Sequence, residues 1–141
     1  MAILNYTTTI DTTKTISEIQ KILAQHKSKA ILTEFDNQGE ITALSFKIDT
    51  LKGELGIKLP ANVEAVYQIL EIQKKKNGKI KATREQATRV AWRIIKDWVE
   101  AQMALIDINM VEIEQVFLPY ILNKNGQTLY QVFEQNNLLL E

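Results

Sequence analysis

Residues 41–59 decide the fold of this chain, and they read ITALSFKIDTLKGELGIKL. Side chains alternate along the first part of this stretch, which places Leu44, Phe46 and Ile48 on one face of an extended segment. The alternation continues over residues 51–59, and residues 30–35 precede it across an Asp-Asn-Gln-Gly loop whose asparagine and glycine tolerate positive φ. The pattern therefore predicts a three-stranded antiparallel β-meander over residues 30–59.

A helix over residues 16–26 is predicted on the N-terminal side of the meander. Residues 15–18 read TISE, which has the form of a capping box that begins at Thr15. Ile16, Ile19 and Leu23 then recur at helical spacing and form one apolar stripe. Residues 6–10 are rich in β-branched side chains and are compatible with a short edge strand.

The chain becomes helical after Pro60, which cannot donate to a strand ladder and ends the third strand. Apolar periodicity predicts helices over residues 62–73, 84–108 and 111–119, with a basic surface loop at residues 74–79. The second of these helices is about 37 Å long at 1.5 Å per residue. Thr83 is its expected N-cap and Asn109 its expected left-handed C-terminal residue. Together these elements predict one α+β domain over residues 1–141.

Two tryptophans lie on the long predicted helix, about 120° of helical rotation apart. Trp98 falls on the apolar stripe, which predicts that it belongs to the core. Trp92 falls between the stripe and several cations. There it either seals the edge of the core or offers an indole face on which a base or a guanidinium stacks.

The composition excludes several classes of protein. The chain has 141 residues, 17 basic and 17 acidic side chains and no cysteine, so it has no net charge and forms no disulfide or thiolate metal site. It contains no long apolar run that would span a membrane, and residues 1–6 lack the features of an export signal. We therefore expect a protein of the cytoplasm.

Signatures of an enzyme are missing from the sequence. His26 is the only histidine, which excludes a catalytic triad and a two-histidine metal site within one chain. Gly53 and Gly56 lie in a strand pattern, and no lysine followed by serine or threonine completes a phosphate loop. We therefore expect a non-enzymatic protein that needs no metal and no cofactor.

Charge is segregated along the C-terminal half of the chain. Residues 74–96 carry nine cations and only one anion, Glu85, whereas residues 97–141 carry seven anions and only Lys124. Cations at the start of a helix are disfavoured by the helix dipole, so their presence there needs a reason. A bound anion and a solvated charged face are the two open interpretations.

The candidate ligand-binding residues lie within this basic segment, where positions three and four apart are neighbours on a helix surface. They are Arg84, Arg89, Trp92, Arg93 and Lys96. Arginine and lysine bind phosphate groups, and an exposed indole would add stacking on a base. The expected ligand is a nucleotide-like small molecule or a nucleic acid.

The same segment resembles a family of small proteins of phages and other mobile elements that have no settled function. The resemblance rests on the Arg-x-x-Trp-Arg-x-x-Lys spacing of residues 89–96, on the Phe-Leu-Pro-Tyr block of residues 117–120 and on the Gly-Gln-Thr of residues 126–128. It extends weakly to the front half. Asn109 stands where relatives often have glycine, a change that a left-handed cap accommodates. The resemblance implies a phage accessory protein and implies no chemistry.

Three functions follow as hypotheses from these observations. The first is a phage protein that sequesters a nucleotide-like anion to counter host defence, as a homo-oligomer that associates through its long helix. The second is a nucleic-acid-binding factor of phage replication or recombination, which uses the basic segment along a phosphate backbone. The third is an inhibitor that binds a host protein through the acidic C-terminal segment.

Overall fold

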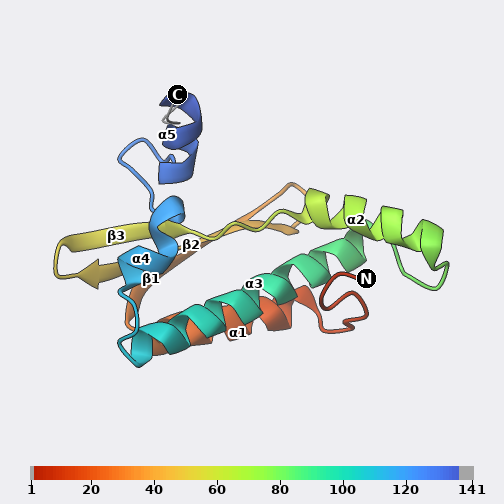
Figure 1. The fold of residues 1–141 in the computed structure, drawn as a ribbon, viewed down its shortest axis with the longest axis horizontal. Helices are drawn as coiled ribbons and strands as arrows, with labels where there is room; N and C mark the ends of the chain where they lie inside the picture. Colours follow the sequence, from red (N-terminus) through yellow and green to blue (C-terminus); the bar gives the residue numbers. More distant parts are fainter. Residues whose placement is uncertain (1, 137–141) are drawn as a thin grey trace. The chain divides into compact units, whose positions relative to one another are not determined.

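The computed structural model describes residues 2–136 and confirms the α+β class (Figure 1). An N-terminal helix precedes a three-stranded antiparallel sheet, and a helical half with one long helix follows it. The elements in chain order are α1 (Thr12–Gln25), β1 (Ser28–Phe35), β2 (Ile41–Thr50), β3 (Gly53–Lys58), α2 (Val63–Lys76), α3 (Arg84–Asp107), α4 (Ile113–Phe117), the 3-10 helix η1 (Leu118–Tyr120) and α5 (Leu129–Asn136).

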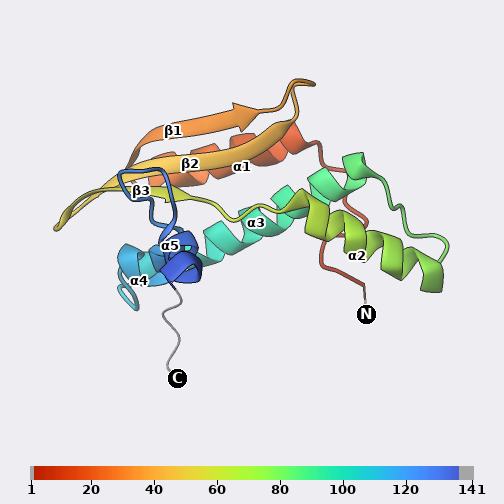
Figure 2. The same cartoon turned by 90° about the horizontal axis from the view of Figure 1, so that it is seen from above.

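The sheet has the predicted meander topology, in the order β1-β2-β3 (Figure 2). Leu44, Phe46 and Ile48 of β2 are buried, as their alternation predicts. Gly39 turns the β1–β2 loop with a φ of 81°. The outer edge of β3 is covered, because the Leu122 amide donates to the Gly56 carbonyl at 2.8 Å and Ile121 pairs with Ile57.

The described chain divides into two compact units, each assembled from two segments of sequence. The first unit comprises residues 1–22 and 61–101, and the second comprises residues 23–60 and 102–141. Leu70, Ile80 and Ala87 form a buried cluster in the first unit. In the second unit the rings of Phe46 and Phe117 pack edge to face, with centroids 5.8 Å apart. The single domain expected over residues 1–141 stays a prediction. Residue 1 and residues 137–141 lie outside the part of the chain that the structure describes, and Glu141, one of the anions counted in the sequence, is among them.

Two predictions for the N-terminal segment are wrong. The capping box does not form, because α1 begins at Thr12 and Thr15 lies fully buried inside the helix. The amide of Thr15 donates to the Asp11 carbonyl at 3.1 Å, so helical hydrogen bonding starts just over one turn earlier than predicted. Residues 6–10 form a turn and an irregular segment instead of a strand.

The helical half departs from the prediction at three places. The helix α2 continues to Lys76, so Lys74, Lys75 and Lys76 form its last turn, where the helix dipole favours cations, and do not lie in a loop. The expected helix over residues 111–119 is instead the short α4 followed by η1. The bounds of α3 agree with the prediction to within one residue, and Asn109 adopts the expected left-handed conformation with a φ of 60°.

The core face of α3 differs from the predicted one. Trp92 is 0% exposed, whereas Trp98 is only half-buried. The buried stripe runs through Trp92, Val99 and Met103, which share one face at a spacing of seven and four residues. The assignment of Trp98 to the core and of Trp92 to its edge is therefore wrong. The Trp92 Nε1 atom is buried and has no hydrogen-bond partner among the described residues.

Gln86 joins the N-terminal segment to the start of α3. Its buried carboxamide Nε2 donates to the carbonyl oxygens of Tyr6 at 3.0 Å and Thr8 at 2.9 Å. The carbonyl oxygens of Tyr6 and Thr8 thus accept hydrogen bonds from a side chain, and not from the backbone amides of a neighbouring strand. The backbone amide of Gln86 donates to the Thr83 hydroxyl at 3.1 Å, which confirms Thr83 as the N-cap of α3.

The burial of Trp92 predicts the stability of two matched variants. We expect Trp92→Ala to lower the free energy of unfolding by about 3 to 5 kcal/mol, because a large side chain leaves a cavity in packed surroundings. Trp98→Ala on the same helix should cost less, since its side chain keeps contact with solvent. Urea denaturation followed by circular dichroism measures both. Equal losses would show that the two indoles are equally well packed.

The bonds of Gln86 predict a second effect on stability. Gln86→Leu should cost about 1 to 3 kcal/mol, because it leaves two carbonyl oxygens without their donor. Amide hydrogen exchange of the residues around Tyr6 and Thr8 should become faster. The control is Gln102→Leu on the same helix, for which little change is expected. Unchanged exchange in Gln86→Leu would contradict the anchoring role.

Candidate functional site

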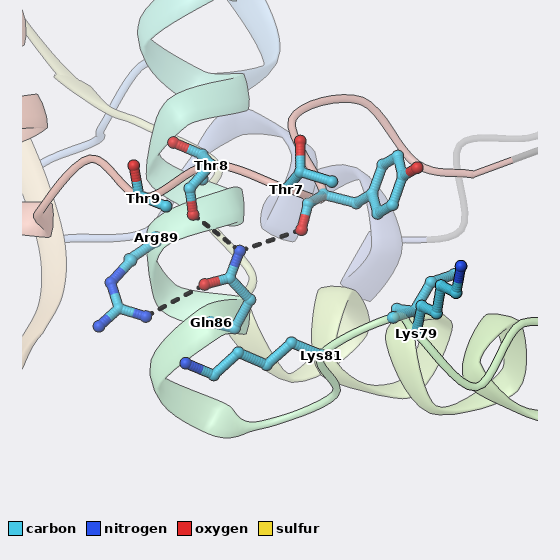
Figure 3. A pocket seen from close by; sticks show the side chains of 9 residues that line it. Thr7, Thr8, Thr9, Lys79, Lys81, Gln86 and Arg89 are labelled. Atoms are coloured by element: carbon cyan, nitrogen blue, oxygen red, sulfur yellow. Dashed lines mark hydrogen bonds between the residues drawn. The ribbon is translucent and has the colours of Figure 1, made fainter.

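A cavity of about 340 Å³ lies in the first unit, beside the N-terminal segment and the first turns of α3 (Figure 3). Three stretches of chain line it: the threonine-rich segment, the loop before α3 and the beginning of α3 itself. The lining residues are Tyr6, Thr7, Thr8, Thr9, Lys79, Ile80, Lys81, Gln86 and Arg89. The volume lies at the lower end of the range that small-molecule sites occupy.

The lining of the cavity is cationic. Lys79, Lys81 and Arg89 contribute positive charge, and no carboxylate belongs to the lining. Figure 3 shows Lys81 running along Gln86 toward the side that holds Arg89, with Lys79 at the opposite end. Within residues 2–136 none of these three cations forms an ion pair with an acidic side chain. Their charges therefore remain available to a ligand.

Gln86 determines how Arg89 is held. Because the Gln86 Nε2 group donates to two backbone carbonyls, the Oε1 atom must face the other way, toward Arg89. The Arg89 Nη1 atom donates to this Oε1 atom at 3.0 Å. A carboxamide orients the guanidinium but does not neutralise it, as a carboxylate would. The half-buried Arg89 thus keeps its net charge and its remaining donors.

Threonines and a structured loop complete the cavity. Thr7 and Thr9 are exposed, and their hydroxyl groups both donate and accept hydrogen bonds. The Thr8 hydroxyl accepts from the Ile10 amide at 3.2 Å, which shapes the segment. On the opposite side, Asn77 shapes the loop, because its Oδ1 atom accepts from the Lys79 amide at 3.2 Å and its carbonyl from the Ile80 amide at 3.1 Å.

The structure does not bring the other predicted site residues to this cavity. Arg84 bonds to the Glu64 carboxylate and stacks over the Tyr67 ring, 4.4 Å from its centroid. The hydrogen bond from Arg84 lowers the pKa of Glu64 below its usual value. Trp92 is inside the core and offers no stacking face, so the interpretation of an exposed indole is wrong.

Arg93 and Lys96 are also paired with acidic groups. Arg93 donates to the Glu18 carboxylate and to the Thr15 hydroxyl, and its side chain is only 15% exposed. Lys96 lies 3.2 Å from the Glu100 carboxylate, one turn further along α3. These cations have structural partners, which explains their presence near the middle of the helix without a ligand.

Only Arg89 among the five predicted residues therefore lines the cavity. Sequence reasoning missed Lys79 and Lys81 as site residues, although both belong to the basic segment that it singled out. It also missed Gln86 and Thr7–Thr9. No local signal identifies these, because their role follows from bonds between residues about eighty positions apart.

Among residues 2–136, no three histidine or acidic side chains converge so as to hold a metal ion. No helix in the described part of the chain combines the length and the apolarity needed to cross a membrane.

Comparisons with known proteins leave the cavity as the main guide to function. The searches against protein-family models, curated proteins and solved structures found no match to this chain.

Proposed function

We propose that the protein binds a small phosphate-bearing anion in the cavity of its first unit and does not transform it chemically. One observation carries the proposal: three cations surround a cavity without a carboxylate partner, whereas Arg84, Arg93 and Lys96 nearby in the sequence are all paired. The half-buried Arg89, held by the neutral Gln86, is the central recognition residue.

The chemistry of the lining favours recognition of phosphate over recognition of a base. Arginine offers several donors in a planar fork that matches phosphate oxygens, and lysines add compact charges. The cavity also borders the first turns of α3, where the helix dipole adds positive potential. The burial of Trp92 removes the stacking platform expected from the sequence. A nucleotide would thus be held by its phosphate groups.

The expected affinity follows from the number of charged contacts. A hydrogen bond to a charged group contributes about 1.5 to 3 kcal/mol, so three cations supply about 4.5 to 9 kcal/mol before the costs of binding. Because the costs of binding are not yet subtracted, dissociation constants between about millimolar and micromolar are the tightest that this range allows. In keeping with the phage accessory protein that the resemblance implies, we propose that the anion is a signalling nucleotide of host defence, which the protein captures. At such an affinity, capture requires abundant protein.

A second candidate function is binding of a nucleic-acid backbone. The exposed Lys74, Lys75 and Lys76 at the end of α2 precede Lys79 and Lys81 along the chain, which gives a longer run of exposed cations. Salt separates the two candidates. A protein that contacts several phosphates of a strand loses affinity steeply as salt increases, whereas a cavity that holds one phosphate group loses less.

Calorimetric titration of the full chain tests the proposal. The probes are inorganic phosphate, a nucleoside triphosphate, a cyclic dinucleotide and a single-stranded oligonucleotide. We expect a phosphorylated small molecule to bind, and Arg89→Ala and Lys81→Ala each to raise the dissociation constant at least about tenfold, because one charge-assisted bond is lost.

Arg84→Ala is the matched control, since this arginine lies on the same helix but is bonded to Glu64 outside the cavity. The Arg84→Ala variant should bind the probe with the same affinity as the wild type. If Arg84→Ala and Arg89→Ala weaken binding equally, the cavity is not the site. If the wild type binds none of the probes, both candidates are wrong and inhibition of a host protein remains.

A further inference from the structure

The two edges of the sheet in the second unit differ. The segment at Ile121 and Leu122 covers the outer edge of β3. The strand β1 pairs only with β2, and among residues 2–136 no backbone hydrogen bond joins its outer edge to another segment. Figure 2 shows β1 along the margin of the sheet. An open edge presents unpaired amide and carbonyl groups that accept a further strand.

The backbone bonds identify the groups that face outward. The Leu59 amide donates to the Leu44 carbonyl, so Leu44 directs its backbone groups toward β3. Thr33 lies opposite Leu44, and Ile31 lies opposite Phe46 two residues further along. In an antiparallel ladder the bonding direction alternates along each strand. Ile31 and Thr33 therefore direct their N–H and C=O groups away from β2, toward the open edge.

The regular part of β1 is symmetric about Leu32. The register with β2 shifts between Ser28 and Ala30 and again between Glu34 and Phe35, which leaves residues 30–34 as an unbroken run centred on Leu32. Leu32 is 59% exposed and Phe35 is 60% exposed, so this strand presents two large apolar side chains to solvent. Nothing within the described part of the second unit covers them.

We propose that the open edge of β1 pairs with the same edge of a second copy of this chain. The strands run antiparallel about a two-fold axis at Leu32, and Ile31 of each copy exchanges hydrogen bonds with Thr33 of the other, about four bonds in all. Leu32 meets Leu32 of the second copy as a closely spaced pair without backbone bonds. The two three-stranded sheets then form one continuous sheet.

Charge complementarity supports a second copy as the occupant of this edge. In the register centred on Leu32, Glu34 lies opposite Ala30 of the other copy, next to its Lys29. The two-fold axis repeats this contact, so an anion and a cation meet at both ends of the paired run. Lys29 also contacts Asp49 and Glu54 of its own chain, whereas Glu34 has no ion pair within residues 2–136.

This inference replaces the long helix with β1 as the surface of self-association, and it does not depend on ligand binding. Sedimentation of the full chain at micromolar concentrations should show a dimer. Leu32→Lys should raise the dimer dissociation constant at least about tenfold, because two lysines then oppose each other on the axis. Leu51→Lys is the control, since Leu51 is fully exposed in the β2–β3 turn, away from the edge.

Disulfide trapping tests the proposed register between the two copies of β1. It gives a result even if the Leu32→Lys variant does not fold. The chain has no native cysteine. A closely spaced antiparallel pair has Cα atoms about 4.5 Å apart, which suits a disulfide. With oxidised glutathione, Leu32→Cys should form a cross-linked dimer faster than Leu51→Cys. A wild-type monomer, a dimer unaffected by Leu32→Lys, or equal cross-linking of the two cysteine variants would each overturn the proposal.

Discussion

The buried carboxamide of Gln86 is the interaction on which the first unit depends most. It donates to two carbonyls of the N-terminal segment and accepts from Arg89 one turn along α3, so one side chain joins that segment to the helix and also orients the guanidinium. A carboxylate at this position would have no N–H groups for the carbonyls, and it would neutralise Arg89. An apolar side chain would leave the carbonyls unsatisfied in a partly buried place. The residue type therefore determines both the path of the segment and the charge of the cavity.

The cations of the basic segment separate into two groups when their partners are known. Arg84 and Arg93 are bonded to carboxylates that lie twenty and seventy-five positions away in the sequence. Lys79, Lys81 and Arg89 have no such partner and surround a cavity. The charge pattern of the sequence identifies the basic segment. It does not distinguish the paired cations from the unpaired ones, because pairing between distant residues is a property of the folded chain. Only one of the five residues chosen from the sequence is therefore at the cavity.

The sequence predicted those features whose cause is local. The alternation of Leu44, Phe46 and Ile48 identified the buried face of β2, and the backbone preference of asparagine identified Asn109 as the end of α3. The choice between Trp92 and Trp98 could not be made in this way. Apolar residues occur on more than one side of α3, and the side that becomes buried depends on what packs against the helix. The start of α1 was also missed, because a plausible capping motif at Thr15 lies inside a helix whose burial only the fold reveals.

The division of the chain into two discontinuous units has a consequence for synthesis on the ribosome. Each unit uses an N-terminal and a C-terminal segment, so neither can be completed from one continuous stretch. The sheet of the second unit is made early, because β1, β2 and β3 need only local pairings. The first unit must wait for residues 61–101 to emerge, and the threonine-rich segment has no Gln86 to bind until then. The cavity is therefore assembled only after most of the chain has been translated.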